Sequence, residues 1–300
     1  MQLSNPLAHP FLAPLAWTLA GLFASSLMAL LLTVRGQWRL LNESVLFQRW
    51  RTWLLIAPLY SLVVLRGPLA VAIFASIIAT QCAREYARLT AMPVADRVVL
   101  FGCALATPLV ALSLPLQQLA YVLLLLPLAA SVPVLLGQDT QRGATRLGRM
   151  AFGLWYVPLA LSAMVLIAIH RGAGVLLGIG LAVALSDVGA FTVGKLLRGP
   201  RLAPRLSPSK TWTGCLGNVT GAALGLGLLR AFAPEAPFIP LLVVVAVGAA
   251  WGDLLESLLK REARAKDSGA WLSGFGGLLD RVDSLLVVQP LAFVVLQVSA

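Results

Sequence analysis

Long runs of apolar residues follow one another along almost the whole chain, with short polar segments between them. Each run is roughly 15–25 residues long, which suits a helix that crosses a bilayer and is too long for the alternating strands of a membrane barrel. The pattern predicts ten such spans, near residues 11–33, 53–65, 67–83, 98–116, 118–137, 150–170, 173–195, 214–232, 237–256 and 284–300. The second and third are short and flank the break at Arg66-Gly67-Pro68, so they form either a helical hairpin or a re-entrant pair.

The composition strengthens this prediction. Hydrophobic residues make up 59% of the chain and charged residues only 12%, whereas soluble domains are about 25% charged. These values exclude an ordinary cytosolic enzyme, a disordered protein and a basic nucleic-acid-binding domain. We therefore expect an all-α integral membrane protein, a polytopic bundle with one membrane domain. Residues 1–170 would form its N-terminal helices, and residues 171–300 the C-terminal helices that carry the polar motifs.

The basic residues are sorted to one side of the predicted spans. Of the 23 Lys and Arg, all but Arg66, Arg171 and Arg230 fall in loops on the same side. Because loops rich in Lys and Arg stay in the cytoplasm, that side is predicted to be cytoplasmic and both termini to lie outside. The acidic residues of the loops, Glu43, Asp96, Asp139 and Glu235, are interpreted as solvated charges.

One carboxylate lies inside a predicted span. Asp187 is preceded and followed by apolar residues in the seventh span. An ionisable residue at this depth costs a few kcal/mol and normally faces the bundle interior or a wet cavity, which makes it a candidate site residue. The alternative is a purely structural hydrogen bond, or an ion pair with Lys195 or an arginine.

More carboxylates flank the two last spans. On a continuous helix, Asp253, Glu256, Ser257 and Lys260 share one face. The end of an amphipathic helix would explain Glu256 and Lys260 as an ordinary pair, but it explains Asp253, one turn deeper, poorly. After a glycine-rich turn at 274–277, a second face carries Asp280, Asp283 and Ser284. Carboxylates without His or Cys nearby are hard oxygen ligands that suit Mg²⁺, and the glycine turn can offer backbone N–H groups to an anion.

A third polar segment, Ser207 to Gly214, enters the eighth span. Ser207 followed by Pro208 is typical of a helix N-cap and first turn. This segment is either ordinary capping, with Lys210 obeying the positive-inside rule, or a helix N-terminus whose hydroxyls and lysine hold a phosphate.

These motifs together resemble the phosphatidate cytidylyltransferases, also called CDP-diacylglycerol synthases. The resemblance rests mainly on residues 257–283, with Ser257 to Arg261, Lys266 to Gly269 and Gly274 to Asp283. Residues 207–214 are similar to the family's Ser-Pro-Lys-Lys-Thr-Trp-Glu-Gly segment, and residues 187–195 to its Asp-x-Gly-Ala-Tyr stretch. The N-terminal half matches mainly through Arg84-Glu85-Tyr86.

The resemblance implies an enzyme that transfers the cytidylyl group of CTP to phosphatidate and releases pyrophosphate. It implies a metal pair, Mg²⁺ and a second cation, with Asp253 and Asp280 as ligands and Asp283 and Asp187 as further candidates. Lys260, Asp280 and Asp253 would be the catalytic residues. The implied substrate-binding residues are Ser207, Lys210, Ser257, Arg261, Lys266, Asp267 and Arg281.

The same resemblance implies the setting of the reaction. We expect CTP, a lipid phosphate and the bilayer as partners, no nucleic acid, and a homodimer as the candidate assembly. The site would face the cytoplasm from a bacterial-type inner membrane.

The chain departs from the family pattern at several positions. Ser273 and Phe275 stand where the family has Pro and His, and Ser209 and Thr213 replace a lysine and a glutamate. These changes indicate a divergent branch of the family. An altered substrate preference is one consequence that such a divergence can have. Two alternatives stay open: another CTP-dependent lipid enzyme, such as a polyprenol kinase or an ether-lipid cytidylyltransferase, and a cation-coupled transporter that uses Asp187 and Asp253.

Overall fold

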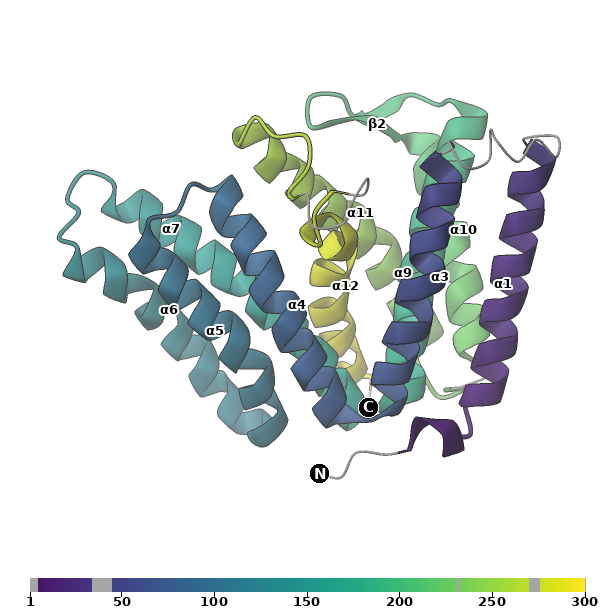
Figure 1. The fold of residues 1–300 in the computed structure, drawn as a ribbon, viewed down its shortest axis with the longest axis horizontal. Coiled ribbons are helices and arrows are strands. Elements are labelled where there is room, and N and C mark those ends of the chain that lie inside the picture. The colour runs from purple at the N-terminus through teal and green to yellow at the C-terminus, as the bar shows by residue number, and fades with distance from the viewer. Residues whose placement is uncertain (1–4, 34–44, 231–232, 270–275, 300) are drawn as a thin grey trace.

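The computed structural model describes residues 5–33, 45–230, 233–269 and 276–299, which fold into helices and one short β-hairpin (Figure 1). The N-terminal elements are η1 (Pro6–Ala8), α1 (Leu12–Thr33), α3 (Val45–Leu65), α4 (Pro68–Leu89), α5 (Val94–Ser113), η2 (Leu116–Gln118) and α6 (Leu119–Leu136). A long, continuous helical segment follows, made of α7 (Gly143–Leu154), the π-helical turn η3 (Trp155–Leu159) and α8 (Ala160–His170). The remaining elements are α9 (Gly172–Leu197), β1 (Arg201–Ala203), β2 (Ser207–Thr211), α10 (Trp212–Leu229), α11 (Phe238–Glu262) and α12 (Leu279–Val298).

Each of the ten predicted spans coincides with a helical segment of the described residues. Six of these segments are long and apolar enough to cross a membrane: Val94–Ser113, Leu116–Leu136, Gly143–His170, Gly172–Leu197, Phe238–Glu262 and Leu279–Val298. Two shorter apolar helices, Leu12–Met28 and Trp50–Leu65, accompany them. The prediction of a helical, multi-pass membrane protein is therefore confirmed.

The second and third spans form a helical hairpin, one of the two predicted possibilities. α4 begins at Pro68, directly after Gly67, whose φ of 103° reverses the chain. The helices are longer than these apolar runs, since α3 and α4 have 21 and 22 residues, whereas the apolar part of α3 is the short segment Trp50–Leu65. In α4 the helix continues beyond the apolar run through Gln81, Arg84 and Glu85, so hydropathy marks only part of it.

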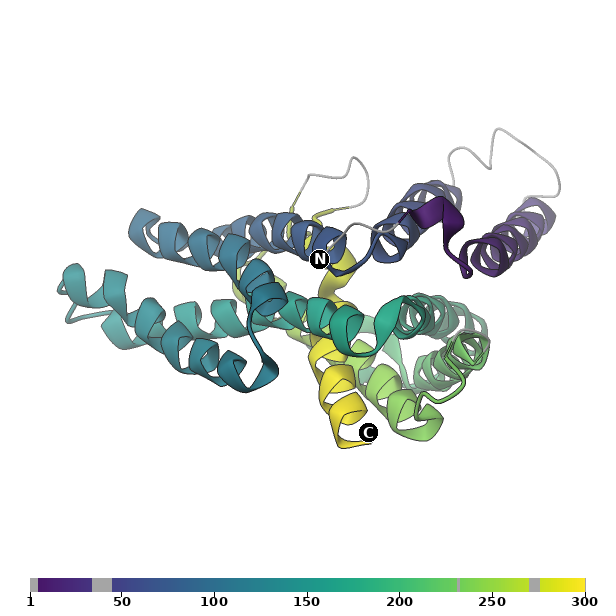
Figure 2. The ribbon, with the colours of Figure 1, turned by 90° about the horizontal axis from the view of Figure 1, so that it is seen from below.

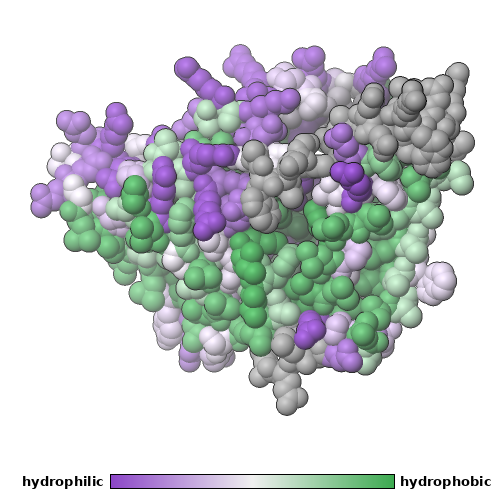
Figure 3. Space-filling view, in the orientation of Figure 1, coloured by the Kyte–Doolittle hydropathy of each residue, from purple (hydrophilic) through white to green (hydrophobic). Residues whose placement is uncertain are grey.

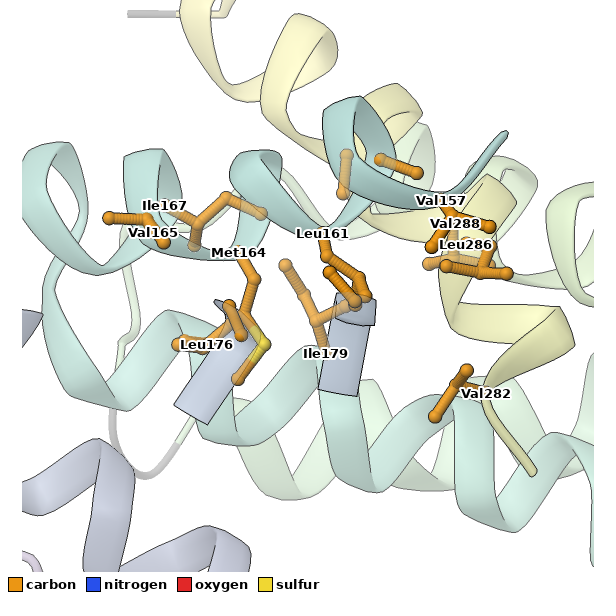
Figure 4. Packing of buried hydrophobic residues seen from close by; sticks show 14 of the residues in the cluster. Val157, Leu161, Met164, Val165, Ile167, Leu176, Ile179, Val282, Leu286 and Val288 are labelled. Carbon is orange, nitrogen blue, oxygen red and sulfur yellow. The ribbon is translucent and has the colours of Figure 1, made fainter. Parts of the chain in front are cut away.

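α12 occupies the centre of the bundle. In both ribbon views it lies between a group formed by α4 to α8 and a group formed by α9 to α11 (Figures 1 and 2), and it packs on α11, α8, α9 and α4. Close packing of apolar side chains holds these helices together, as expected where lipid replaces water. Figure 4 shows part of this core: Val157, Leu161, Met164, Val165, Ile167, Leu176, Ile179, Val282, Leu286 and Val288.

Polar side chains gather at one end of the bundle. Figure 3 shows hydrophilic residues over the top of the molecule and an apolar surface below them. The same end carries the β1–β2 hairpin and the C-terminal end of α11 (Figure 1). The residues of the candidate site belong to helices that meet beneath this polar end.

Candidate active site

The site is built where α11 and α12 come into close contact. α11 is one continuous helix of 25 residues, so the predicted polar face from Asp253 to Lys260 exists. At Gly252 a Cβ atom would lie 2.2 Å from the carbonyl oxygen of Asp283, so only glycine lets the two backbones approach this far. The acidic site is defined here as five carboxylates from three helices: Asp187 on α9, Asp253 and Glu256 on α11, and Asp280 and Asp283 on α12.

Lys260 joins the two helices. Its Nζ lies 2.7 Å from Oδ1 of Asp280 and also pairs with Glu256, as the i, i+4 spacing predicts. Glu256 is only 1% exposed, and its Oε1 has no hydrogen-bond partner among the described residues. A buried carboxylate oxygen without a donor is costly, because its hydration has been removed and not replaced. The site thus retains an unused acceptor beside a lysine.

Lys210 approaches the same face from the hairpin. Its Nζ lies 2.5 Å from Oδ2 of Asp253 and 3.3 Å from the carbonyl oxygen of Ala250. The Asp253 side chain is 44% exposed, so this carboxylate is open to a ligand. Asp253 and Asp283 are close enough for their charges to interact. Two carboxylates this close repel unless a proton or a cation offsets their charge.

The predicted helix N-cap at Ser207 is wrong. Residues Ser207–Thr211 form strand β2, which pairs antiparallel with β1, and α10 begins only at Trp212. Thr211 caps this helix instead, because its Oγ1 accepts a 3.0 Å hydrogen bond from the backbone N–H of Gly214. Ser207 is buried at the start of β2, and Lys210 reaches the site from a strand.

Asp187 connects α9 to α12. Its Oδ1 accepts a 3.3 Å hydrogen bond from the hydroxyl of Ser284. Lys195, the alternative partner, lies over the ring of Phe191 instead, with its Nζ 5.6 Å from the ring centroid. Asp187 is partly buried and contacts α12 through this hydroxyl.

Asp280 binds the turn that precedes it. Its Oδ2 accepts hydrogen bonds from Ser268 N at 2.9 Å, Ser268 Oγ at 2.7 Å and Gly277 N at 2.7 Å. The glycine-rich segment was expected to offer N–H groups to a bound anion. In the described part of that segment, the N–H of Gly277 serves the chain's own carboxylate.

Sequence reasoning missed one member of this arrangement, Glu85 on α4. Its carboxylate accepts hydrogen bonds from the backbone N–H groups of Leu278 at 3.0 Å and Leu279 at 2.8 Å. The only sequence signal for Glu85 is the resemblance of Arg84-Glu85-Tyr86 to the family. Nothing in its spacing indicates contact with a segment more than 180 positions away.

The other predicted substrate-binding residues lie around this centre. Arg261 is exposed and donates from Nε to the carbonyl oxygen of Leu206 at 3.1 Å, which ties α11 to the hairpin. Ser257 and Arg281 are half-buried, and Lys266 and Asp267 are exposed. Asp267 also lines a separate cavity of about 540 Å³, together with Arg88, Arg149 and Glu262. The departures at Ser273 and Phe275 lie outside the described residues.

The acidic site has the chemistry of a hard cation site. Within the described ranges no group of three or more Asp, Glu, His or Cys side chains is arranged to hold a metal ion. The donors are nevertheless all oxygens: the adjacent carboxyls of Asp253 and Asp283, Asp187 beside Ser284, and the unpartnered Oε1 of Glu256. Mg²⁺ keeps several waters and needs only one or two carboxylates, so these residues fit a divalent cation.

Comparison with known proteins assigns the family. The profile of the cytidylyltransferase family matches residues 47–299. The phosphatidate cytidylyltransferase of Brucella suis biovar 1 is 45% identical over 112 residues, which cover 36% of this chain and 41% of that protein. The namesake enzymes of Mycobacterium leprae (38% over 145 residues, 47% of this chain and 46% of that protein) and Thermotoga maritima (35% over 121 residues, 37% and 45%) are also similar. These matches span less than half the length of the relatives, whereas the family profile covers most of the chain, which therefore belongs to the cytidylyltransferase family.

Proposed function

We propose that this protein transfers the cytidylyl group of CTP to the phosphate of a membrane lipid, with phosphatidate as the substrate. The observation that carries the proposal is the convergence of two lysines and five carboxylates, from α9, the hairpin, α11 and α12, in a chain of the cytidylyltransferase family. The similar enzymes named phosphatidate cytidylyltransferase support the choice of lipid.

The charges of the site suit the charges of the reactants. CTP and a lipid phosphate are both strongly anionic at neutral pH, so bringing them together requires cations more than it requires a general base. Lys260 and Lys210 would supply positive charge to the phosphates of CTP and of the lipid. In the structure both ammonium groups are held by carboxylates, which fixes their positions before substrate binds.

The acidic residues would hold the metal. Asp253, Asp283 and Asp187 are the proposed ligands, with the predicted ligand Asp280 as a further candidate that also holds Lys260. A bound Mg²⁺ would neutralise phosphate charge and stabilise the pyrophosphate leaving group.

The transfer is a substitution at phosphorus. An oxygen of the lipid phosphate forms a bond to the α-phosphorus of CTP, and the bond from that phosphorus to the bridging β-oxygen breaks. The products are CDP-lipid and pyrophosphate. A lipid phosphate is already ionised at pH 7, so no residue has to remove a proton from the nucleophile. We place this site at the cytoplasmic end of the bundle, where the basic loops are predicted to lie.

The proposal is tested by following two positions of label in CTP. The purified protein, given Mg²⁺ and phosphatidate in mixed micelles, should convert cytidine-labelled CTP into a chloroform-soluble product and should leave the γ-phosphate label in water. Parallel reactions with an ether-lipid phosphate and with a polyprenol define the lipid. Incorporation of γ-label into the polyprenol would identify a kinase, and no incorporation of either label would overturn the proposal.

A further inference from the structure

We propose that Glu85 is a positioning residue for the transfer reaction: from α4 it holds the N-terminal end of α12, which carries Asp280, and through Asp280 it sets the position of Lys260. This inference rests on the proposed function. Glu85 is 4% exposed, and the donors to its carboxylate are uncharged. They are Leu278 N, Leu279 N and Gln81 Nε2 at 3.0 Å, while Ser268 Oγ, whose one proton is shared with the nearer Asp280, lies 3.2 Å from Oε2.

The position of Glu85 matches a need of α12. The first N–H groups of a helix have no partner within the helix, and the helix dipole favours a negative charge there. The N-cap residue of α12 is Leu278, which has no side chain able to cap it. Glu85 supplies that cap from another helix, because its two oxygens accept the N–H groups of Leu278 and Leu279.

Two glycines, Gly269 and Gly277, make room for this carboxylate. A Cβ atom on Gly277 would lie 2.3 Å from Oε2 of Glu85, and one on Gly269 would lie 2.7 Å from Oε1. Such distances are below contact, so either substitution would displace the carboxylate or the backbone. The absence of a side chain at these two glycines therefore leaves the space that the Glu85 carboxylate occupies.

Ser268 links Glu85 to Asp280. Its Oγ lies 3.2 Å from Oε2 of Glu85 and 2.7 Å from Oδ2 of Asp280. A second contact from α4 reinforces this link, since Arg88 donates from Nη2 to the carbonyl oxygen of Ser268. Asp280 in turn accepts from Lys260 through Oδ1. Each step is a direct contact, and within the described residues the polar contacts of Glu85 are with Gln81, Ser268 and the start of α12, so its effect on the reaction would pass through Asp280.

The test is Glu85→Gln, which keeps the shape of the side chain. Each carboxylate oxygen of Glu85 accepts a backbone N–H, so the amide nitrogen of Gln must face one of these N–H groups whichever way it is turned. We expect kcat for cytidylyl transfer to fall at least tenfold, with KM for the lipid changed less than about threefold. Glu85→Asp keeps both acceptors on a shorter side chain and should restore part of the rate.

Hydrogen–deuterium exchange separates positioning from general stability. In Glu85→Gln the peptide covering residues 276–282 should exchange faster, while peptides from α5 and α7 should not change. The matched control is Asp96→Asn, which removes an equally buried carboxylate that lies on α5 and contacts Arg146. It should leave exchange at 276–282 and kcat of the folded protein unchanged.

A second combination tests the path through Ser268. Ser268→Ala removes the hydroxyl that lies between the two carboxylates, so the double variant with Glu85→Gln should lose little more activity than the worse single variant. A Glu85→Gln enzyme with kcat within twofold of the parent would overturn the inference, and so would an equal loss in Asp96→Asn. If the parent protein transfers no cytidylyl group, the proposed function fails, and unchanged exchange at 276–282 would separately overturn the contact between Glu85 and the turn.

Discussion

Two groups of carboxylates, one in each half of the chain, are organised in opposite ways. The first, called here the Asp96 network, consists of Asp96, Asp139 and Arg146. Nη2 and Nε of Arg146 lie 2.6 and 3.1 Å from the two oxygens of Asp96, and its Nη1 lies 2.9 Å from Asp139. This network joins α5, the loop after α6, and α7 through one guanidinium, and both oxygens of Asp96 are satisfied by Arg146.

The acidic site differs in charge balance and in access. It places five carboxyl groups near two lysines, Lys210 and Lys260, so its carboxyl groups outnumber its ammonium groups. Glu256 Oε1 lacks a donor, and Asp253 is 44% exposed, whereas Asp96 is 1% exposed. A buried carboxylate bonded at both oxygens by one arginine holds helices together, whereas excess charge beside an opening is suited to recruit cations. We therefore propose that the same residue type serves structure in one half of the chain and chemistry in the other.

The largest effect that would test this contrast is on catalysis. Asp253→Asn removes a charge from the open side of the acidic site, and we expect kcat to fall at least a hundredfold, about 2.7 kcal/mol of barrier. The measurement is the rate of CDP-lipid formation at saturating CTP and Mg²⁺. Asp96→Asn is the control, because it removes a carboxylate of similar type from the other group.

Two results would contradict the roles assigned to the two groups of carboxylates. If Asp253→Asn keeps more than about a tenth of the parent rate, roughly 1.4 kcal/mol of barrier, Asp253 has no metal-binding role. If Asp96→Asn loses as much activity as Asp253→Asn, the division between structure and chemistry is wrong.

A smaller effect, on stability, is expected from the Asp96 network. Asp96→Asn removes the charge that faces Arg146 and leaves one acceptor in its place, at an expected cost of about 2 kcal/mol. Thermal unfolding of the purified protein in detergent should show a lower melting temperature. Arg146→Lys should also lower it, because an ammonium cannot bond both oxygens of Asp96 and also reach Asp139. A melting temperature equal to that of the parent in both variants would contradict the structural role.

The helices were largely predictable from sequence, and the errors have local causes. Apolar runs located the ten long helical segments of the described residues, because burial in lipid requires such runs. They did not show that α4 continues through Glu85, or that α5 starts at Val94. The early start of α5 places Asp96 in the first turn and beneath Arg146, so the prediction of a solvated Asp96 was wrong. Glu235, interpreted in the same way, is exposed as expected, and Glu43 lies outside the described residues.

Residue spacing predicted the site only where its residues share a helix, and the resemblance to the family joined the remaining segments. The i, i+3 and i+4 spacings placed Asp253, Glu256 and Lys260 on one face, and the structure confirms this through the contacts of Lys210 and Asp280. Contacts between distant segments leave no periodic trace, so the partnership of Glu85 with Leu278 and Leu279 could not be read from spacing. Similarly, Ser207-Pro208 fits a helix start, and only the pairing of β2 with β1 shows why the helix begins five residues later.

The smallest expected effect concerns Asp139, the outer member of the Asp96 network. The backbone N–H of Arg142, together with the guanidinium of Arg146, lowers the pKa of Asp139 from its ordinary value of 3.8. A carboxyl whose pKa is lower in the folded state stabilises the protein above the unfolded pKa and loses that contribution as the pH falls through the folded value. Between about pH 6 and about pH 3, the parent should therefore lose more thermal stability than Asp139→Asn, in which the titrating group is absent. Because Asp139 is near the surface, the two proteins should differ only slightly in the slope of melting temperature against pH. Added salt should reduce this difference further. The control is Glu235→Gln, at an exposed carboxylate outside the network, which should leave this slope unchanged. Equal slopes for the parent and Asp139→Asn would show that Arg146 contributes to folding through Asp96 alone.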